Sequence, residues 1–112
     1  MLGRWKVSTS IKMECTIIQY NCQRSYVAMC ELGEIMSEKR AGVALLQEPF
    51  FRCKKVCGLP TGIKIFSADD GRAAVVVRDT SLECMLVTEC TDDRGVCVWL
   101  KGAVGEMYVI SV

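Results

Sequence analysis

VALLQEPF, residues Val43 to Phe50, is the stretch that decides the fold. Its first five residues form a nearly unbroken apolar run, which predicts a short strand buried on both faces in the middle of a layered α/β domain. Pro49 has no N–H for a strand ladder and biases Glu48 toward an extended conformation, so regular pairing should stop there. We therefore expect Glu48 at the carboxyl end of a central strand, where α/β folds usually place ligands and metals. An ordinary solvated glutamate is the alternative interpretation.

Upstream of this stretch, the sequence predicts a strand and then a helix. CTIIQYN, Cys15 to Asn21, is rich in strand-forming residues and ends on a short polar side chain. Ser25 can cap a helix that extends to Glu38 or Lys39, because apolar residues recur there at helical spacing. This apolar stripe consists of Ala28, Leu32, Ile35 and Met36. In a parallel strand–helix–strand unit, Asn21 and Glu48 would end neighbouring strands at the same edge of the sheet.

Downstream, the pattern changes to short strands. FRCKKVCGLPTG (51–62) is predicted to be a loop, and GIKIF (62–66) a strand followed by the turn ADDG. Four further apolar segments predict an antiparallel meander. They are RAAVVVRD (72–79), ECMLVTEC (83–90), VCVWLKG (96–102) and EMYVISV (106–112). The predicted fold is α/β: the amino-terminal half of a layered α/β sandwich with a mixed, largely antiparallel sheet.

The predicted domain boundaries leave residues 1–13 as a lead-in without regular structure and 14–112 as a partial domain. The chain stops inside the apolar segment EMYVISV, so we expect it to be truncated at its carboxyl end. Its 112 residues allow one domain or part of one, with a globular balance of 51% hydrophobic and 24% charged residues. No apolar run approaches the roughly 20 residues that span a bilayer, and no secretory signal is evident.

Cysteine and histidine usage restricts the possible chemistry. The chain has no histidine, which excludes Ser–His, Cys–His and His–metal sites, and no phosphate-binding glycine motif. Its eight cysteines lack the paired CxxC spacing of a zinc site. We expect reduced, mostly buried thiols, with Cys84 and Cys97 beside apolar runs, in an intracellular protein.

Asn21 and Glu48 are the remaining candidates for a site. A carboxylate oxygen suits Mg²⁺, which usually takes only one or two protein carboxylates and keeps several waters. An amide beside it can hydrogen-bond a phosphate or a metal-bound water. Together they would form half of a site for cleaving phosphodiesters.

IIQYNCQRS followed by VALLQEPF resembles the opening of the endonuclease/exonuclease/phosphatase superfamily. Within it, the chain from Met13 to Val112 is most similar to the apurinic-endonuclease-like domain of non-LTR retrotransposons. The resemblance implies that Glu48 holds a catalytic Mg²⁺ or Mn²⁺ and that Asn21 helps to place the scissile phosphate of DNA. It also implies attack by a metal-activated water, and a nuclear location. The later family motifs, a Tyr, an Asp-x-Asn and an Asp-His pair, are absent from this chain, so we expect it to be inactive alone.

Two other functions are compatible with the same residues. One is a non-catalytic remnant or interaction domain, and the other is a phosphatase or phospholipase of the same superfamily. Arg52, Lys54 and Lys55 follow Glu48 and either contact DNA phosphates or form a solvated loop. Trp99 and Tyr108 lie in apolar segments and are predicted to be core residues. Net charge is +1, which argues neither for nor against a nucleic-acid partner.

Overall fold

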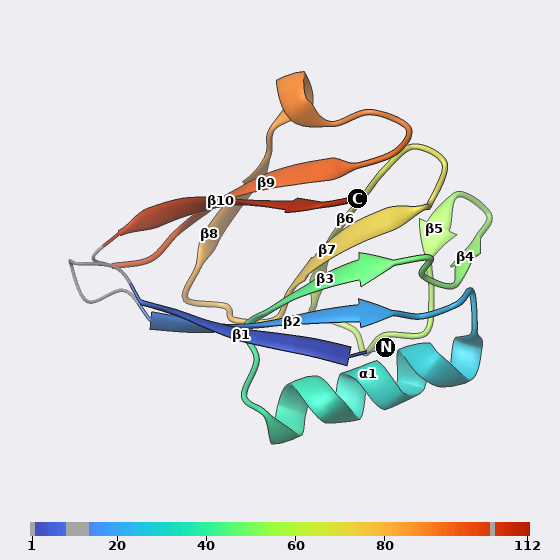
Figure 1. Ribbon diagram of the computed structural model, residues 1–112, viewed down its shortest axis with the longest axis horizontal. Coiled ribbons are helices and arrows are strands. Elements are labelled where there is room, and N and C mark those ends of the chain that lie inside the picture. Colours follow the sequence, from blue (N-terminus) through green and yellow to red (C-terminus); the bar gives the residue numbers. More distant parts are fainter. Residues whose placement is uncertain (1, 9–13, 104) are drawn as a thin grey trace.

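The computed structural model describes residues 2–8, 14–103 and 105–112, which form three layers: a helix, a five-stranded sheet and a three-stranded sheet (Figure 1). The five-stranded sheet has the order β1-β2-β3-β7-β6. Its strands are β1 (Leu2–Ser8), β2 (Glu14–Asn21), β3 (Val43–Gln47), β7 (Ala73–Val77) and β6 (Lys64–Ser67). β2 and β3 are parallel, whereas the other three neighbouring pairs are antiparallel. The predicted mixed, largely antiparallel sheet is therefore confirmed.

Helix α1 (Tyr26–Glu38) connects β2 to β3 and begins where the sequence predicts. The Ser25 hydroxyl accepts a hydrogen bond of 3.2 Å from the backbone N–H of Ala28, which satisfies one of the unpaired donors of the first turn. Three residues of the helix are fully buried against the sheet: Met29, Leu32 and Met36. Ala28 and Ile35, which belong to the predicted stripe, flank these residues and are half-buried.

Two hydrophobic cores lie on opposite faces of the five-stranded sheet, and the alternation of side chains along each strand explains them. Ile18, Ala44 and Val76 face α1, whereas Ile17, Val43 and Val75 face the second sheet. All five residues of β7 are buried, so this strand contributes to both cores. The unbroken apolar runs of β3 and β7 are thus explained by cover on both sides.

The second sheet is antiparallel, has the order β10-β9-β8, and consists of β8 (Glu83–Leu86), β9 (Val96–Lys101) and β10 (Glu106–Ser111). A 3₁₀ turn, η1 (Thr88–Cys90), connects β8 to β9. The predicted four-stranded meander is wrong in one member, because β7 pairs with β3 and β6. A strand that is apolar on both faces needs cover on both faces, which only the sandwiched sheet provides.

Three other local predictions also need correction. The lead-in contains β1, which pairs antiparallel with the edge of β2, while residues 9–13 lie outside the described part of the chain. The predicted loop contains a small hairpin, β4 (Phe51–Arg52) and β5 (Lys55–Val56), because Cys53 and Lys54 both adopt the left-handed conformation that a tight turn requires. Tyr108 is 63% exposed rather than buried, because it lies on the outer face of the second sheet.

The cysteine side chains that the structure describes are free, but most of them are not buried. Only Cys22 and Cys97 are buried among these seven, and Cys84 is half-buried. Three thiols, those of Cys30, Cys53 and Cys90, are exposed, so the expectation of mostly buried thiols is wrong. These residues lie on the helix surface, the hairpin turn and η1, where neighbouring apolar residues in the sequence give no cover.

Candidate functional site

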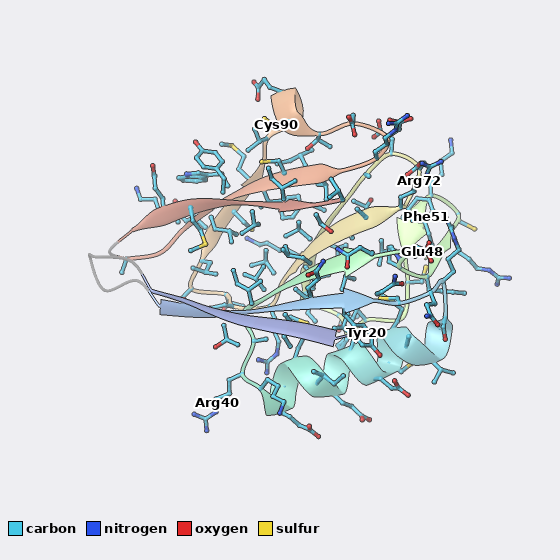
Figure 2. The ribbon with its side chains drawn as sticks, in the orientation of Figure 1. Tyr20, Arg40, Glu48, Phe51, Arg72 and Cys90 are labelled. Atoms are coloured by element: carbon cyan, nitrogen blue, oxygen red, sulfur yellow. The ribbon has the colours of Figure 1, made fainter. Side chains whose placement is uncertain are left out.

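The carboxyl ends of β2 and β3 meet beside an open pocket. The parallel register pairs Asn21 with Gln47, so Glu48 follows one position beyond the end of the ladder. The pocket has a volume of about 660 Å³ and is lined by both predicted site residues, Asn21 and Glu48. Its other lining residues are Arg24, Gln47, Arg72, Arg94 and Val112. Figure 2 shows Glu48 and Arg72 at the same end of the sheet.

The backbone of Glu48 is held from two sides. Its N–H donates to the carbonyl of Arg72 and its carbonyl accepts from the N–H of Arg24, each at 2.8 Å. Glu48 has a φ of 48°, so the extended conformation predicted for the residue before Pro49 is wrong. The two hydrogen bonds offset the strain of this left-handed conformation and turn the chain out of the sheet. Its carboxylate side chain is exposed on the pocket wall.

A local turn fixes the orientation of the Asn21 amide. The backbone N–H of Gln23 donates to Asn21 Oδ1 at 3.0 Å, and the N–H of Cys22 donates to the carbonyl of Gln47 at 2.9 Å. Because a backbone N–H can only donate, the amide oxygen must face Gln23. The Nδ2 group of Asn21 is consequently the end that can donate to an anion in the pocket.

Gln47 and Ser111 join the two sheets at this pocket. Gln47 Nε2 donates to Ser111 Oγ at 3.3 Å, and this hydroxyl donates to the Leu46 carbonyl at 2.7 Å. Ser111 is 1% exposed, and its hydrogen bonds make this burial tolerable. Neither residue was predicted to belong to the site. The sequence feature that could have identified them is the polar residue Ser111 on the inward-facing side of an otherwise apolar strand.

The pocket lining and its immediate neighbours carry charges of both signs. Arg24, Arg72 and Arg94 carry positive charge, whereas Glu48 is the one acidic side chain of the lining. Arg72 Nε forms an ion pair of 2.7 Å with Asp70 Oδ2, in which the arginine side chain is 60% exposed. Asp92 Oδ1 accepts from the N–H groups of Arg94 and Gly95, and these hydrogen bonds lower the pKa of Asp92. None of the three arginines was predicted from the sequence.

The cations that were predicted from the sequence lie elsewhere. Arg52 and Lys55 belong to the β4–β5 hairpin and Lys54 to its turn, and all three are exposed. None of them lines the pocket. The Arg52 guanidinium instead lies 5.8 Å from the centroid of the Phe50 ring. Sequence proximity to Glu48 is therefore a poor guide, because the chain turns away at Pro49.

The donor set fits a weakly held divalent cation. Within the described ranges, no three acidic or thiol side chains cluster as a ready-made metal cage. One exposed carboxylate, that of Glu48, nevertheless suits Mg²⁺, which commonly binds one or two protein carboxylates together with water and substrate phosphate. The three arginines offer N–H donors that phosphate oxygens can accept, and Asp70 and Asp92 beside them offset part of their charge.

Comparisons with known proteins give related retrotransposon sequences and a related solved structure. The chain is 35% identical over 96 residues to a 115 kDa protein of the type-1 retrotransposable element R1DM of Drosophila melanogaster, which covers 86% of this chain and 9% of that protein. It is 38% identical over 63 residues to the retrovirus-related Pol polyprotein of the type-1 element R1 of Bradysia coprophila, covering 52% of this chain and 6% of that protein. No family model matches the chain.

A solved structure shares both the fold and part of the sequence. The endonuclease domain of TRAS1, a telomere-specific non-LTR retrotransposon, superposes with a TM-score of 0.71 at 29% sequence identity. The match covers 85% of this chain and 42% of that domain. The chain thus spans less than half of the solved domain and about a tenth or less of the two curated relatives. In the described part of the chain, no helix is both long and apolar enough to cross a bilayer.

Proposed function

We propose that this chain, a relative of the endonuclease domain of non-LTR retrotransposons, provides the amino-terminal part of a DNA endonuclease. The observation that carries the proposal is the convergence of Asn21 and Glu48 on one pocket at the carboxyl ends of two parallel strands. The similarity to the TRAS1 endonuclease domain, which covers 85% of the chain, supports this proposal. The substrate is duplex DNA, and the reaction is hydrolysis of a phosphodiester.

Glu48 would hold the divalent cation, Mg²⁺ or Mn²⁺, through its exposed carboxylate. When bound, such an ion polarises a phosphoryl oxygen and stabilises negative charge on the leaving oxygen. The backbone hydrogen bonds of Glu48 to Arg24 and Arg72 fix the backbone position from which this carboxylate extends. This site would belong to the endonuclease/exonuclease/phosphatase superfamily.

Asn21 would orient the scissile phosphate. Its oxygen is occupied by the Gln23 N–H, so its Nδ2 donates toward the pocket, where a phosphate oxygen can accept. A neutral amide can orient a phosphate by hydrogen bonding without adding charge. Good orientation can lower a reaction barrier by several kcal/mol, roughly 7–11 in the best intramolecular cases. Because the proposed substrate is duplex DNA, we further propose that the protein acts in the nucleus.

A chimera tests this function. Residues 14–112 of this chain replace the matching part of the TRAS1 endonuclease domain, and plasmid nicking is measured with Mg²⁺. We expect nicking in the parent chimera and its loss, by at least roughly a hundredfold, in Glu48→Gln. Glu83→Gln is the matched control, because Glu83 is an exposed glutamate at the other end of the second sheet.

A folded chimera without nicking activity, or one in which Glu48→Gln nicks as well as the parent, would overturn the proposal. Circular dichroism establishes that the chimera is folded. Hydrolysis of a phosphomonoester or a phospholipid, but not of DNA, would instead assign the pocket to a different phosphoesterase.

A further inference from the structure

We infer that Arg24, Arg72 and Arg94 form a cradle that binds the phosphates of a nucleic-acid strand before any metal is present. This inference deepens the proposed function and rests on it, since it assigns the binding of the substrate to side chains outside the Asn21 and Glu48 pair. The three arginines come from three separate segments. Arg24 lies in the turn after β2, Arg72 precedes β7, and Arg94 precedes β9.

Two of the arginines are fixed beside Glu48 by their own backbone. The Arg24 N–H donates to the Glu48 carbonyl and the Arg72 carbonyl accepts from the Glu48 N–H. These hydrogen bonds place one arginine residue on each side of the Glu48 backbone. Gln23 and Arg24 have φ values of 50° and 57°, so the turn that presents Arg24 adopts an uncommon left-handed conformation.

Arg94 reaches the same pocket from the second sheet. Its backbone N–H donates to Asp92 Oδ1 at 2.8 Å, and the Asp92 N–H donates to the Gly95 carbonyl at 3.0 Å, which closes a tight turn. At the start of β9, Val96 pairs with Ser111, whose hydroxyl bonds the end of β3. The join between the sheets therefore brings Arg94 to the Glu48 end of the molecule.

The ion pair between Arg72 and Asp70 does not prevent the three arginines from binding phosphate. Asp70 contacts Arg72 at Nε, and a guanidinium carries five N–H donors, more than one carboxylate occupies. An exposed pair of this kind contributes only about 0–1 kcal/mol and is screened by salt, so a phosphate can displace or share it. Guanidinium groups suit phosphate because they offer parallel N–H donors.

The donors of the pocket lining predict that DNA and metal assist each other. The three arginines offer N–H donors to phosphate oxygens, whereas Glu48 in the lining and Asp70 and Asp92 beside it balance much of their positive charge. A bound phosphate supplies the negative charge that the cation lacks, so DNA should tighten metal binding, and the metal should tighten DNA binding by the same factor. Strand binding in the absence of metal is the measurable consequence.

The experiment measures binding of a short fluorescein-labelled DNA duplex to the 112-residue chain in EDTA by fluorescence anisotropy, over a range of salt concentrations. The variants are Arg24→Gln, Arg72→Gln and Arg94→Gln. Each should weaken binding roughly three- to tenfold and reduce the salt slope by about one, because each removes one phosphate contact. Arg78→Gln is the matched control, since Arg78 follows the opposite end of β7 and is exposed. Glu48→Gln should bind as tightly as the parent or more tightly.

Absence of binding by the folded chain, or an equal loss in Arg78→Gln and the cradle variants, would overturn the inference. Competition by inorganic phosphate as effective as that by DNA would also overturn it, because a strand must contact more than one arginine. Circular dichroism and urea unfolding identify any variant that fails to fold, and for such a variant the lysine substitution replaces glutamine and should retain part of the binding. Since the assay contains no metal and measures no cleavage, an inactive chimera would reject the proposed function without affecting this result.

Discussion

The backbone carbonyl of Glu48 accepts a hydrogen bond of 2.8 Å from the N–H of Arg24. This bond connects the residue after β3 to the turn after β2, beyond the last paired residues of the parallel ladder, Asn21 and Gln47. It makes the backbone conformations of the turn at Arg24 and of Glu48 depend on each other. The same turn positions the Asn21 amide through Gln23.

Two substitutions of Arg24 distinguish the effect of its backbone conformation on stability from the effect of its charge on DNA binding. Because its φ is 57°, Arg24→Gly should leave the free energy of unfolding within about 1 kcal/mol of the parent or raise it, while weakening DNA binding. Arg24→Val should lower the free energy of unfolding by about 1–2 kcal/mol, since a β-branched residue is strained there. Urea unfolding measures both variants, and equal stability of the two would show that the left-handed turn is not maintained in solution.

Gly71 is packed beneath the β4–β5 hairpin. It is buried with a φ of 77°, and an added Cβ would collide with the ring of Phe51. Gly71→Ala should lower the free energy of unfolding by about 2–4 kcal/mol, combining backbone strain with overpacking. It should also speed amide exchange at Glu48, whose N–H bonds the carbonyl of Arg72 next to Gly71.

Gly62 provides the control for that substitution. Its φ is 86°, and a Cβ added there meets nothing within 4 Å. Gly62→Ala should therefore report the backbone strain alone, about 1–2 kcal/mol. If Gly71→Ala is no more destabilising than Gly62→Ala, the hairpin does not pack on Gly71 as described.

The buried thiol of Cys22 should make the folded chain less stable at alkaline pH. Burial raises the pKa of its thiol from 9.0 to about 11, so the folded state retains a proton that the unfolded state loses. Stability from this group is complete below pH 9 and is lost as the pH rises toward about 11. Urea unfolding between these pH values should show a smaller loss in Cys22→Ala than in the parent, and an equal loss would contradict the assignment.

The 112-residue chain alone should not nick plasmid DNA with Mg²⁺ above the level of its Glu48→Ala variant. The described residues provide no cluster of three ligands, and the sequence contains no histidine to act as a base. General acid–base assistance typically contributes a factor of roughly 10²–10⁴, so its absence is decisive for a slow reaction. Metal-dependent nicking that disappears in Glu48→Ala would show that Asn21, Glu48 and the arginines suffice.

Those parts of the fold that depend on local patterns can be predicted from the sequence. The apolar run of β3, the cap at Ser25 and the polar ends of β2 and β3 are sufficient to place Asn21 and Glu48 together. The assignment of β7 to the first sheet was not predicted, because strand pairing depends on which faces other elements cover. The sequence of β1 alternates the apolar residues Trp5 and Val7 with the basic residues Arg4 and Lys6. This short alternation is only a weak indication of a strand, and in the structure the segment is a strand that pairs with β2.

The arginines were missed for a physical reason. Arg24, Arg72 and Arg94 lie in turns, and the sequence separation between them is large. Only the register of β2 against β3, of β3 against β7, and the contact of Ser111 with Leu46 bring these turns to one pocket. Basic residues near Glu48 in sequence, such as Lys54, are carried away by the hairpin instead.

The central claim is that a divalent cation binds beside Asn21 and Glu48, and NMR tests it most directly. The ¹⁵N-labelled chain is titrated with Mn²⁺ in the presence and absence of a short DNA duplex, and paramagnetic broadening of the amide signals is followed. We expect selective broadening of the signals of Asn21 to Arg24 and of Glu48, stronger with DNA and absent in Glu48→Gln. Broadening that avoids these residues, or that persists unchanged in Glu48→Gln, would contradict the claim.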